Sequence, residues 1–429
     1  MPNVLIYRNE LLPPSETFIV AQTGAMEHHT PIFAGWKRVE NSLSLPGGPP
    51  LIFNSGNTLM DKLRRKTYWS LGGADKFARA VAAKEPVVVH AHFALDAAAF
   101  VPVAQRLGIP FFVTMHGYDV TSHDRDLCRS FVGRNFLAKR RQLREAADCF
   151  LCVSEFIRRT AIERGYPEGK LLVHYIGVDC ESFTRDNAIQ REPIVLFVGR
   201  LVEVKGCIHL IRAMTQIEAR FPSARLVVIG DGPLRTELQE AARRQLKRCE
   251  FLGVQSSESI KKWLNRSSVF CVPSISEGLG IGFLEAQSMG VPVVSFKTGG
   301  IPEAVIHGEG GLLAPQKDEK TLAEYISIFL EDDKQWELAS KAGRQWVMRT
   351  FDLKRQTRLL EEHYLRFYGA SSSGSAVEPL LNQLQVMSPS SYGVVPAASH
   401  RTDQRINQKE HHARRSSHAE PAGKERWKI

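Results

Sequence analysis

Cysteine is scarce in this chain, with seven among 429 residues. An odd number of scattered cysteines argues against a disulfide framework. Cys149 and Cys152 have the spacing of zinc ligands, but they lie in the strand-like run Cys-Phe-Leu-Cys-Val. Side chains alternate along a strand, so these two cysteines would point to opposite faces of a sheet. No second pair of cysteine or histidine residues is present to supply the other two zinc ligands. We therefore expect no zinc site.

Long apolar runs are also absent. No stretch approaches the roughly 20 apolar residues that a membrane-spanning helix needs. The residues from Met1 to Arg8 lack the positively charged start and the apolar core of a secretory signal. We therefore predict a protein that is made and kept in the cytoplasm.

Motifs of two cofactor-dependent kinds of site are missing. Residues 8–15, which follow the first expected strand, do not contain the Gly-x-Gly-x-x-Gly of dinucleotide-dependent oxidoreductases. No Asp-x-Asp stands at the end of an expected strand, where it would hold a metal ion. We expect neither a metal nor a cofactor.

Positive charge is in excess, with a formal net charge of +10. This balance predicts an acidic partner, which is anionic lipid, nucleic acid or a phosphorylated substrate. A basic run from Lys62 to Trp69 fits a solvated helix face slightly better than a membrane-docking patch. A helix expected at 127–147 is amphipathic and rich in cations, but no nucleic-acid motif accompanies it, so we exclude nucleic acid. Its cations and apolar residues are Arg134, Lys139, Arg140, Arg141, Arg144, Leu127, Phe131, Phe136 and Leu143.

Strands and helices alternate along the chain in two series. The first begins with the apolar run Val4 to Tyr7 and the second restarts at Ile194, after a polar segment from Asp186 to Glu192. Alternation of this kind predicts an α/β fold of two doubly wound parallel sheets, whose ligands bind beyond the carboxyl ends of the strands. We place an N-terminal domain at 1–185, a C-terminal domain at 186–351 and a disordered Ser/His-rich basic tail at 370–429.

The stretch from Ser274 to Pro302 carries the most specific chemistry. Apolar runs at 268–273 and 291–296 frame it as buried strands. Between them, glycines let backbone amides approach a ligand, and a helix that opens near Gly282 directs its free N–H groups toward the same loop. Glu277 and Glu285 are acceptors suited to hydroxyl groups. A ligand with both phosphate and sugar hydroxyls would suit this stretch, since the phosphate would bind the N–H groups and the hydroxyls would bind the carboxylates.

The spacing Glu-x7-Glu resembles the donor-site signature of retaining glycosyltransferases of family 4, which have the GT-B fold. Glu-Gly-x-Gly at its start and Ala-x-x-Met-Gly-Val-Pro-Val-Val after it make the resemblance specific. It implies that Glu277 holds the transferred sugar and Glu285 the ribose. It also implies two Rossmann-like domains that face a cleft, and a last helix at 352–368 that crosses back to the N-terminal domain.

Other segments extend the resemblance. Gly199-Arg200-Leu-Val-Glu-Val-Lys205-Gly206 is similar to the family's diphosphate-binding segment, and the backbone after the strand at 249–253 is where the base would lie. His116, at the end of an expected strand, corresponds to a histidine that contacts the donor sugar. The implied catalytic residues are His116, Glu277, Arg200 and Lys205. The implied donor-binding residues are Arg200, Lys205, Val254, Glu277, Gly278, Gly280, Ile281, Gly282 and Glu285.

The segment from Pro14 to Phe18 resembles the start of bacterial exopolysaccharide and colanic-acid-type glycosyltransferases. It implies an acceptor side formed by Ser15, Glu16, Thr17 and His92, and a lipid-linked oligosaccharide as acceptor, reached from an anionic inner-leaflet membrane surface. One departure is that many family members have a Gly-Gly pair after the first strand, whereas only Gly24 lies nearby here.

The implied reaction moves a sugar from a UDP- or GDP-sugar to a hydroxyl with retention of configuration. No carboxylate stands where a nucleophile would be needed, so departure and attack on one face of the sugar are favoured over a covalent intermediate. A catalytically inactive nucleotide-sugar- or polysaccharide-binding protein of the same fold is the alternative. The joint presence of both glutamates, both cations and His116 argues against it. A sugar phosphorylase would need a cofactor lysine in a characteristic setting, which we do not find.

Overall fold

The computed structural model describes residues 1–13, 15–39, 42–53 and 73–373. The basic run from Lys62 to Trp69 lies outside these residues. The predicted tail at 370–429 does so from residue 374 onward, and its first four residues belong instead to the end of a helix, α16 (Leu353–Ser373).

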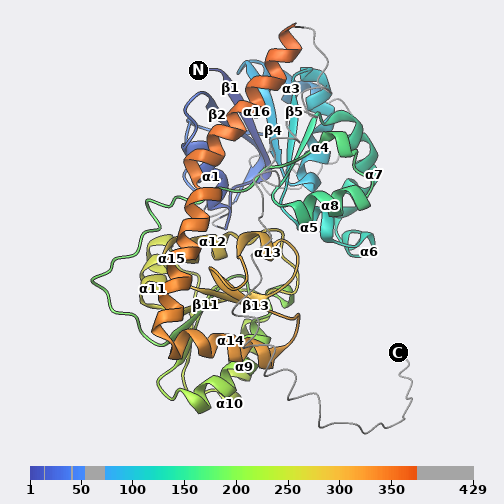
Figure 1. The fold of residues 1–429 in the computed structure, drawn as a ribbon. Coiled ribbons are helices and arrows are strands. Elements are labelled where there is room, and N and C mark those ends of the chain that lie inside the picture. The colour runs from blue at the N-terminus through green and yellow to red at the C-terminus, as the bar shows by residue number, and fades with distance from the viewer. Residues whose placement is uncertain (14, 40–41, 54–72, 374–429) are drawn as a thin grey trace, which may run out of the picture. The chain divides into compact units, whose positions relative to one another are not determined.

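The first half of the chain forms a seven-stranded parallel sheet in the order β3-β2-β1-β4-β5-β6-β7 (Figure 1). Buried apolar runs explain why β1, β4, β5 and β6 are inner strands of a parallel sheet, whereas half-buried β3 lies at one edge. The strands are β1 (Asn3–Leu11), β2 (Thr30–Arg38), β3 (Leu51–Ile52), β4 (Pro86–His92), β5 (Phe111–Met115), β6 (Cys149–Cys152) and β7 (Leu171–Val173). The helices of this half are α1 (Thr17–Gly24), α3 (Gly73–Ala82), α4 (Ala94–Leu107), α5 (Tyr118–Thr121), α6 (Asp124–Leu127), α7 (Phe131–Ala146) and α8 (Glu155–Glu163).

The second half forms a six-stranded parallel sheet in the order β10-β9-β8-β11-β12-β13. Its strands are β8 (Ile194–Val198), β9 (Arg225–Ile229), β10 (Cys249–Gly253), β11 (Val269–Cys271), β12 (Val293–Phe296) and β13 (Gly311–Ala314). Its helices are α9 (Cys207–Arg220), α10 (Arg235–Gln245), α11 (Ser257–Arg266), α12 (Ile281–Ser288), α13 (Ile301–Ala304), α14 (Glu319–Glu331) and α15 (Asp333–Thr350). Two Rossmann-like parallel sheets confirm the predicted fold class.

Helix α16 returns to the first sheet, as predicted. Its start pairs with the end of the first half, because Val178 donates its N–H to the Phe351 carbonyl at 2.7 Å and the N–H of Leu353 returns to the Val178 carbonyl at 3.0 Å. Farther along, the helix buries Tyr364 and Phe367 in a core beneath β1 and β5. The last helix among the described residues therefore covers one face of the first sheet.

Alternation along β6 has the predicted consequence for its two cysteines. Cys149 packs in the core that contains Tyr364, whereas Cys152 packs in the core on the other face of the sheet. Both side chains are fully buried, and burial raises the pKa of each thiol.

The single helix predicted at 127–147 is wrong. The structure has two helices, α6 and α7, separated at residues 128–130. Ser130 begins α7 as its N-cap, because its hydroxyl accepts the N–H of Gly133 at 2.9 Å. The predicted apolar stripe is also interrupted, since Phe136 and Leu143 are buried but Phe131 is 53% exposed.

Glu361 on α16 fastens this helix to the loop before β2. Its carboxylate accepts the backbone N–H of Glu27 at 3.0 Å and of His28 at 2.8 Å, and lies 2.9 Å from the Nδ1 atom of His29. Burial raises the pKa of this carboxyl, but the hydrogen bonds from Glu27, His29 and His28 outweigh burial and leave the pKa below 4.5. The ionised carboxylate therefore stabilises the folded state.

We expect Glu361→Ala to lower the free energy of unfolding by about 2 kcal/mol, because two backbone donors and an imidazole lose their acceptor. Glu362→Ala, which removes the adjacent carboxylate, is the control and should change stability little. The folded-state pKa lies below the unfolded value, so the stabilisation is complete above pH 4.5 and is lost as the pH falls below it. Urea unfolding at pH 7 and pH 4 measures both effects. Equal losses for the two variants would contradict this role.

Candidate functional site

Loops at the carboxyl edge of the second sheet are packed backbone against backbone. The N–H of Leu201, after β8, bonds to the Asp231 carbonyl after β9 at 2.9 Å. The N–H of Ile275, after β11, bonds to the Val204 carbonyl at 2.8 Å. A side chain at Gly206 would meet the Pro273 carbonyl at 1.9 Å, so only glycine permits this approach. The predicted diphosphate segment and the Glu277 segment thus share one edge.

Lys205 and Glu277 form the central pair of this edge. The Nζ atom of Lys205 lies 2.5 Å from the Oε2 atom of Glu277, and the Ser274 hydroxyl donates to the same oxygen at 3.2 Å. The two charged side chains remain 27% and 15% exposed. A ligand that reaches this pair would therefore contact a cation and a hydrogen-bond acceptor together.

Helix α12 begins directly after Gly280, which has a φ of +90°. No side chain caps this end, so its first N–H groups are left to an anion or to water. Glu285 lies one turn into the helix, and burial raises the pKa of its carboxyl to about 7. Within the described ranges, its carboxylate has no hydrogen bond or ion pair. These features leave both the helix end and Glu285 available to a ligand.

Arg200 and Val254 are placed differently from Lys205. Arg200 is exposed and has no ion pair or hydrogen bond through its side chain among the residues that the structure describes. Val254, 69% exposed, follows the edge strand β10, two strands from β8, which is roughly 10 Å at the spacing of a sheet. At this separation, Arg200 and Val254 could contact different parts of one extended ligand.

The first sheet brings His92 and His116 together, because they end the neighbouring strands β4 and β5. The Nδ1 atom of His92 lies 3.1 Å from the Nε2 atom of His116. Burial holds the pKa of both imidazoles well below 6.5, so both rings are neutral at pH 7. Phe93 packs on the His116 ring with centroids 4.4 Å apart.

The His116 loop touches the Glu277 loop. A side chain at Gly278 would lie 2.2 Å from the His116 carbonyl. The hydroxyl of Ser154 donates to the Gly278 carbonyl at 2.6 Å. Of the predicted catalytic residues, the structure therefore brings His116, Lys205 and Glu277 into one continuous set of contacting segments.

Glu303, a residue that the sequence analysis did not assign, makes a second link between the halves. Its carboxylate accepts the N–H of Glu155 at 2.7 Å and of Phe156 at 2.9 Å, at the start of α8. It also accepts the Tyr175 hydroxyl at 3.2 Å. A carboxylate at this position complements the positive end of α8.

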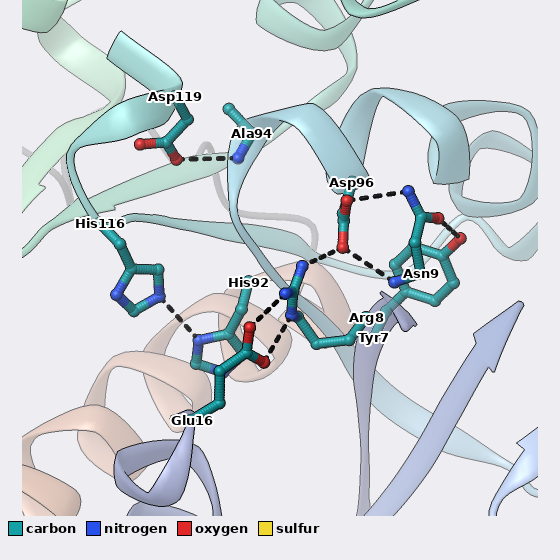
Figure 2. A network of polar contacts seen from close by, with 9 residues as sticks. All are labelled: Tyr7, Arg8, Asn9, Glu16, His92, Ala94, Asp96, His116 and Asp119. Carbon is teal, nitrogen blue, oxygen red and sulfur yellow. Dashed lines mark hydrogen bonds and ion pairs between the residues drawn. The ribbon is translucent and has the colours of Figure 1, made fainter. Parts of the chain in front are cut away.

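Among the residues predicted for the acceptor side, Glu16 forms an ion pair with Arg8. Figure 2 shows the Arg8 guanidinium between the carboxylates of Glu16 and Asp96, with hydrogen bonds to both. Ser15 and Thr17 are exposed on either side of buried Glu16. Of the four described residues that were predicted for the acceptor side, Ser15 and Thr17 are exposed, whereas Glu16 and His92 are buried.

Arg8 and Asp96 were missed in the sequence. Asp96 also accepts the N–H and the side-chain amide of Asn9, at 2.9 and 2.8 Å. Burial and the neighbouring Glu10 raise the pKa of Asp96, and Arg8 and Asn9 lower it, with a net increase. The available signal was an arginine at the polar end of an apolar strand. Its partner, 88 positions away, left no local pattern.

Asp119 was also missed. Its carboxylate accepts the N–H of Ala94 at 3.0 Å (Figure 2). It also accepts the N–H of Gly117 at 2.9 Å, and so joins the turns after β4 and β5. The tripeptide Gly-Tyr-Asp after His116 is therefore a support for the His116 turn.

Two parallel Rossmann-like sheets, loops suited to a nucleotide and a returning last helix define the GT-B class of proteins. Residues 42–177 match the family model described as "Glycosyl transferase 4-like domain". Residues 180–346 match the model described as "Glycosyl transferases group 1". The chain belongs to family 4 of the glycosyltransferases and is a glycosyltransferase enzyme.

Individual relatives agree with this assignment. YqgM of Bacillus subtilis, named an uncharacterized glycosyltransferase, is 26% identical over 292 residues, which are 68% of this chain and 79% of YqgM. The putative colanic acid biosynthesis glycosyltransferase WcaL of Salmonella typhimurium is 31% identical over 230 residues, or 51% of this chain and 54% of WcaL. The match thus spans about half the length of WcaL.

A solved structure shares the fold. HepE from Anabaena, crystallised with UDP and glucose, superposes with a TM-score of 0.68 at 18% identity. The superposition covers 85% of this chain and 99% of HepE.

We expect Gly278→Ala to destabilise the protein by about 1–3 kcal/mol, because its methyl group would overlap the His116 carbonyl and force the two loops apart. Gly24→Ala, where nothing lies within 4 Å of the added atom, is the control. It should be neutral or slightly stabilising. Thermal unfolding of both variants tests this, and a Gly278→Ala protein as stable as the control would show that the loops do not touch.

Proposed function

We propose that this enzyme transfers a sugar from a UDP- or GDP-sugar, with retention of configuration, to a hydroxyl of a growing lipid-linked exopolysaccharide repeat unit. The observation that carries the proposal is the Lys205–Glu277 pair, 2.5 Å apart, on a loop that touches the His116 turn. A cation for a phosphate, an acceptor for sugar hydroxyls and a neutral imidazole are thereby gathered at one place.

The donor diphosphate would lie between Arg200, Lys205 and the start of α12. These groups stabilise the negative charge that develops on the leaving diphosphate. Without a donor, Glu277 neutralises Lys205. With a donor, Lys205 would be shared with a phosphate oxygen while Glu277 accepts hydroxyl groups of the sugar. Gly278, Gly280, Ile281 and Gly282 would line the phosphates and sugar with backbone amides.

The rest of the nucleotide would extend along the sheet edge. The Glu285 carboxylate would accept the ribose hydroxyls, and the backbone beside exposed Val254 would receive the base. Since cationic side chains and a helix end already balance the diphosphate charge, we propose that no metal or cofactor is required.

The chemistry would be departure and attack on the same face of the sugar. The carboxylate nearest the predicted sugar position, Glu277, is paired with Lys205 and serves to orient the sugar. His116, kept neutral by burial, would bind a sugar oxygen and does not supply a positive charge.

The acceptor is proposed to be lipid-linked, and the enzyme to lie in the cytoplasm at the inner face of the membrane. WcaL, named for colanic acid biosynthesis, supports an exopolysaccharide acceptor. Exposed residues around α5, α6 and α7 support contact with anionic lipid, since Tyr118 is 61% exposed, Phe131 is 53% exposed and the Arg125 and Arg129 side chains are 81% and 80% exposed. In the part of the chain that the structure describes, no helix is long and apolar enough to cross a membrane.

We expect one nucleotide sugar of a UDP- and GDP-sugar panel to raise the unfolding temperature of the wild type and to have little effect on Arg200→Ala. The exposed Arg243→Ala, on α10, is the matched control and should keep the shift. Binding with no sugar transfer to any hydroxyl acceptor would favour an inactive binding protein. The absence of any shift from a folded wild type would overturn the donor site.

The ionisation of Glu285 gives a second test. Burial raises the pKa of this carboxyl to about 7 from 4.5, so the acceptor for the ribose hydroxyls would change from mostly neutral to mostly ionised as the pH rises through about 7. A nucleotide sugar is suitable because its diphosphate lacks the second ionisation of a phosphate monoester. We expect its affinity to increase by about threefold to tenfold from pH 6 to pH 8 in the wild type and to stay level in Glu285→Gln. Calorimetry at both pH values measures this.

The same pKa affects stability with a definite sign. Because the folded-state pKa exceeds the unfolded value, ionisation of Glu285 opposes folding as the pH rises from about 4.5 to 7. Glu285→Gln should therefore stabilise the ligand-free protein more at pH 8 than at pH 5. A pH-independent effect of this substitution would contradict the raised pKa.

A further inference from the structure

His92 has an unusual combination of contacts. Its side chain is 1% exposed. The Nδ1 atom faces His116 at 3.1 Å, while the buried Nε2 atom has no hydrogen-bond partner among the described residues. A nitrogen of this kind limits where the ring proton can be, because a buried N–H without an acceptor is uncommon in proteins and costs free energy.

The neighbouring ring, His90, does not relieve this limit. It stacks on His92 with centroids 4.4 Å apart, but both its nitrogens are used. One lies 2.5 Å from the Tyr364 hydroxyl and the other 2.6 Å from the Thr114 hydroxyl. His90 therefore packs against the face of His92 and exchanges no proton with it.

Two neutral imidazoles can share the His92–His116 hydrogen bond in only two ways. If His116 donates through Nε2, His92 must carry its own proton on Nε2, where it would be a buried donor without an acceptor. If His92 donates through Nδ1, its Nε2 atom is a bare nitrogen. The positive charge of Arg8, which helps to lower the pKa of His92 after burial, His90 and His116, also favours a bare nitrogen over an N–H. The second arrangement is therefore the stable one.

We propose that His92 is a positioning residue that holds His116 with its proton on Nδ1, so that His116 presents an N–H donor to an oxygen of the transferred sugar. Figure 2 shows this second nitrogen turned away from His92, and no described residue makes a hydrogen bond to it. The identity of the ligand rests on the proposed function, whereas the tautomer does not.

This arrangement defines what His116 does. An Nδ1–H group recognises a sugar hydroxyl as an acceptor and takes no proton from the attacking hydroxyl. His116 thus orients the donor sugar and is not the base of the reaction. His92 acts on catalysis only through this ring.

The direct test is the ring ¹⁵N spectrum of the full-length protein labelled in histidine, at pH 7.5. We expect the His116 signals, identified by their loss in His116→Gln, to show a protonated Nδ1 atom and a bare Nε2 atom. A protonated Nε2 atom in the wild type would overturn the proposal without any variant of His92. His92→Asn, whose side-chain amide replaces the Nδ1 donor, should keep the tautomer. His92→Leu should give a mixture.

A binding test separates this inference from the proposed function. His92→Leu should weaken the affinity for the nucleotide sugar about threefold to tenfold, leave the affinity for the nucleotide diphosphate without sugar unchanged, and be rescued by His92→Asn. Equal weakening for both ligands would indicate a structural role and contradict the proposal. If the wild type shows the expected tautomer but binds no nucleotide sugar, the donor site fails while the role of His92 stands.

Discussion

The contact between the Gly278 loop and the His116 turn is the constraint on which the rest of the site depends. A hydrogen atom is all that fits at Gly278 facing the His116 carbonyl. Because that space is filled by backbone, main-chain packing holds the two loops that carry Glu277 and His116 against each other. The side chains of Ser154 and Glu303 also form hydrogen bonds between the two halves, so the contact between the loops does not depend on Gly278 alone.

The buried positive charge of Arg8 in the first half of the chain also needs specific neighbours. Arg8 is surrounded by two carboxylates and stacks on the Phe93 ring, with its guanidinium carbon 4.3 Å from the ring centre. The same Phe93 ring packs on His116. A buried cation is tolerated only when it is paired and hydrogen-bonded, and through the Phe93 ring this paired cation is packed next to the His116 imidazole.

Local sequence patterns predicted much of the fold, including its strands and one of its loops. Apolar runs such as Ile194 to Val198 are short, continuous and rich in β-branched residues, which favours a buried strand, and the glycine spacing after β11 predicted a loop before the next helix. The break between α6 and α7 at Ser130 was missed because cationic residues occur on both sides of it. This continuous charge pattern gives no sign of the helix N-cap. Arg8, Asp96 and Glu303 were missed because their partners are distant in sequence, and a pairing across many positions leaves no periodic trace. The engagement of Glu16 by Arg8, only eight positions away, was missed because the two residues are brought together by an irregular turn between β1 and α1, which has no periodic pattern.

The return of α16 to the first sheet has a consequence for biosynthesis. A ribosome makes β1 early and Tyr364 and Phe367 very late, yet these aromatic side chains lie in one core with β1, and the Tyr364 hydroxyl bonds to His90 next to His92. Until the final helix emerges, the underside of the first sheet has an uncovered apolar surface. Domains usually fold in the order of their synthesis, but here the half that is translated first is completed last. The core of the first sheet therefore cannot be completed until the second half of the chain has been synthesised.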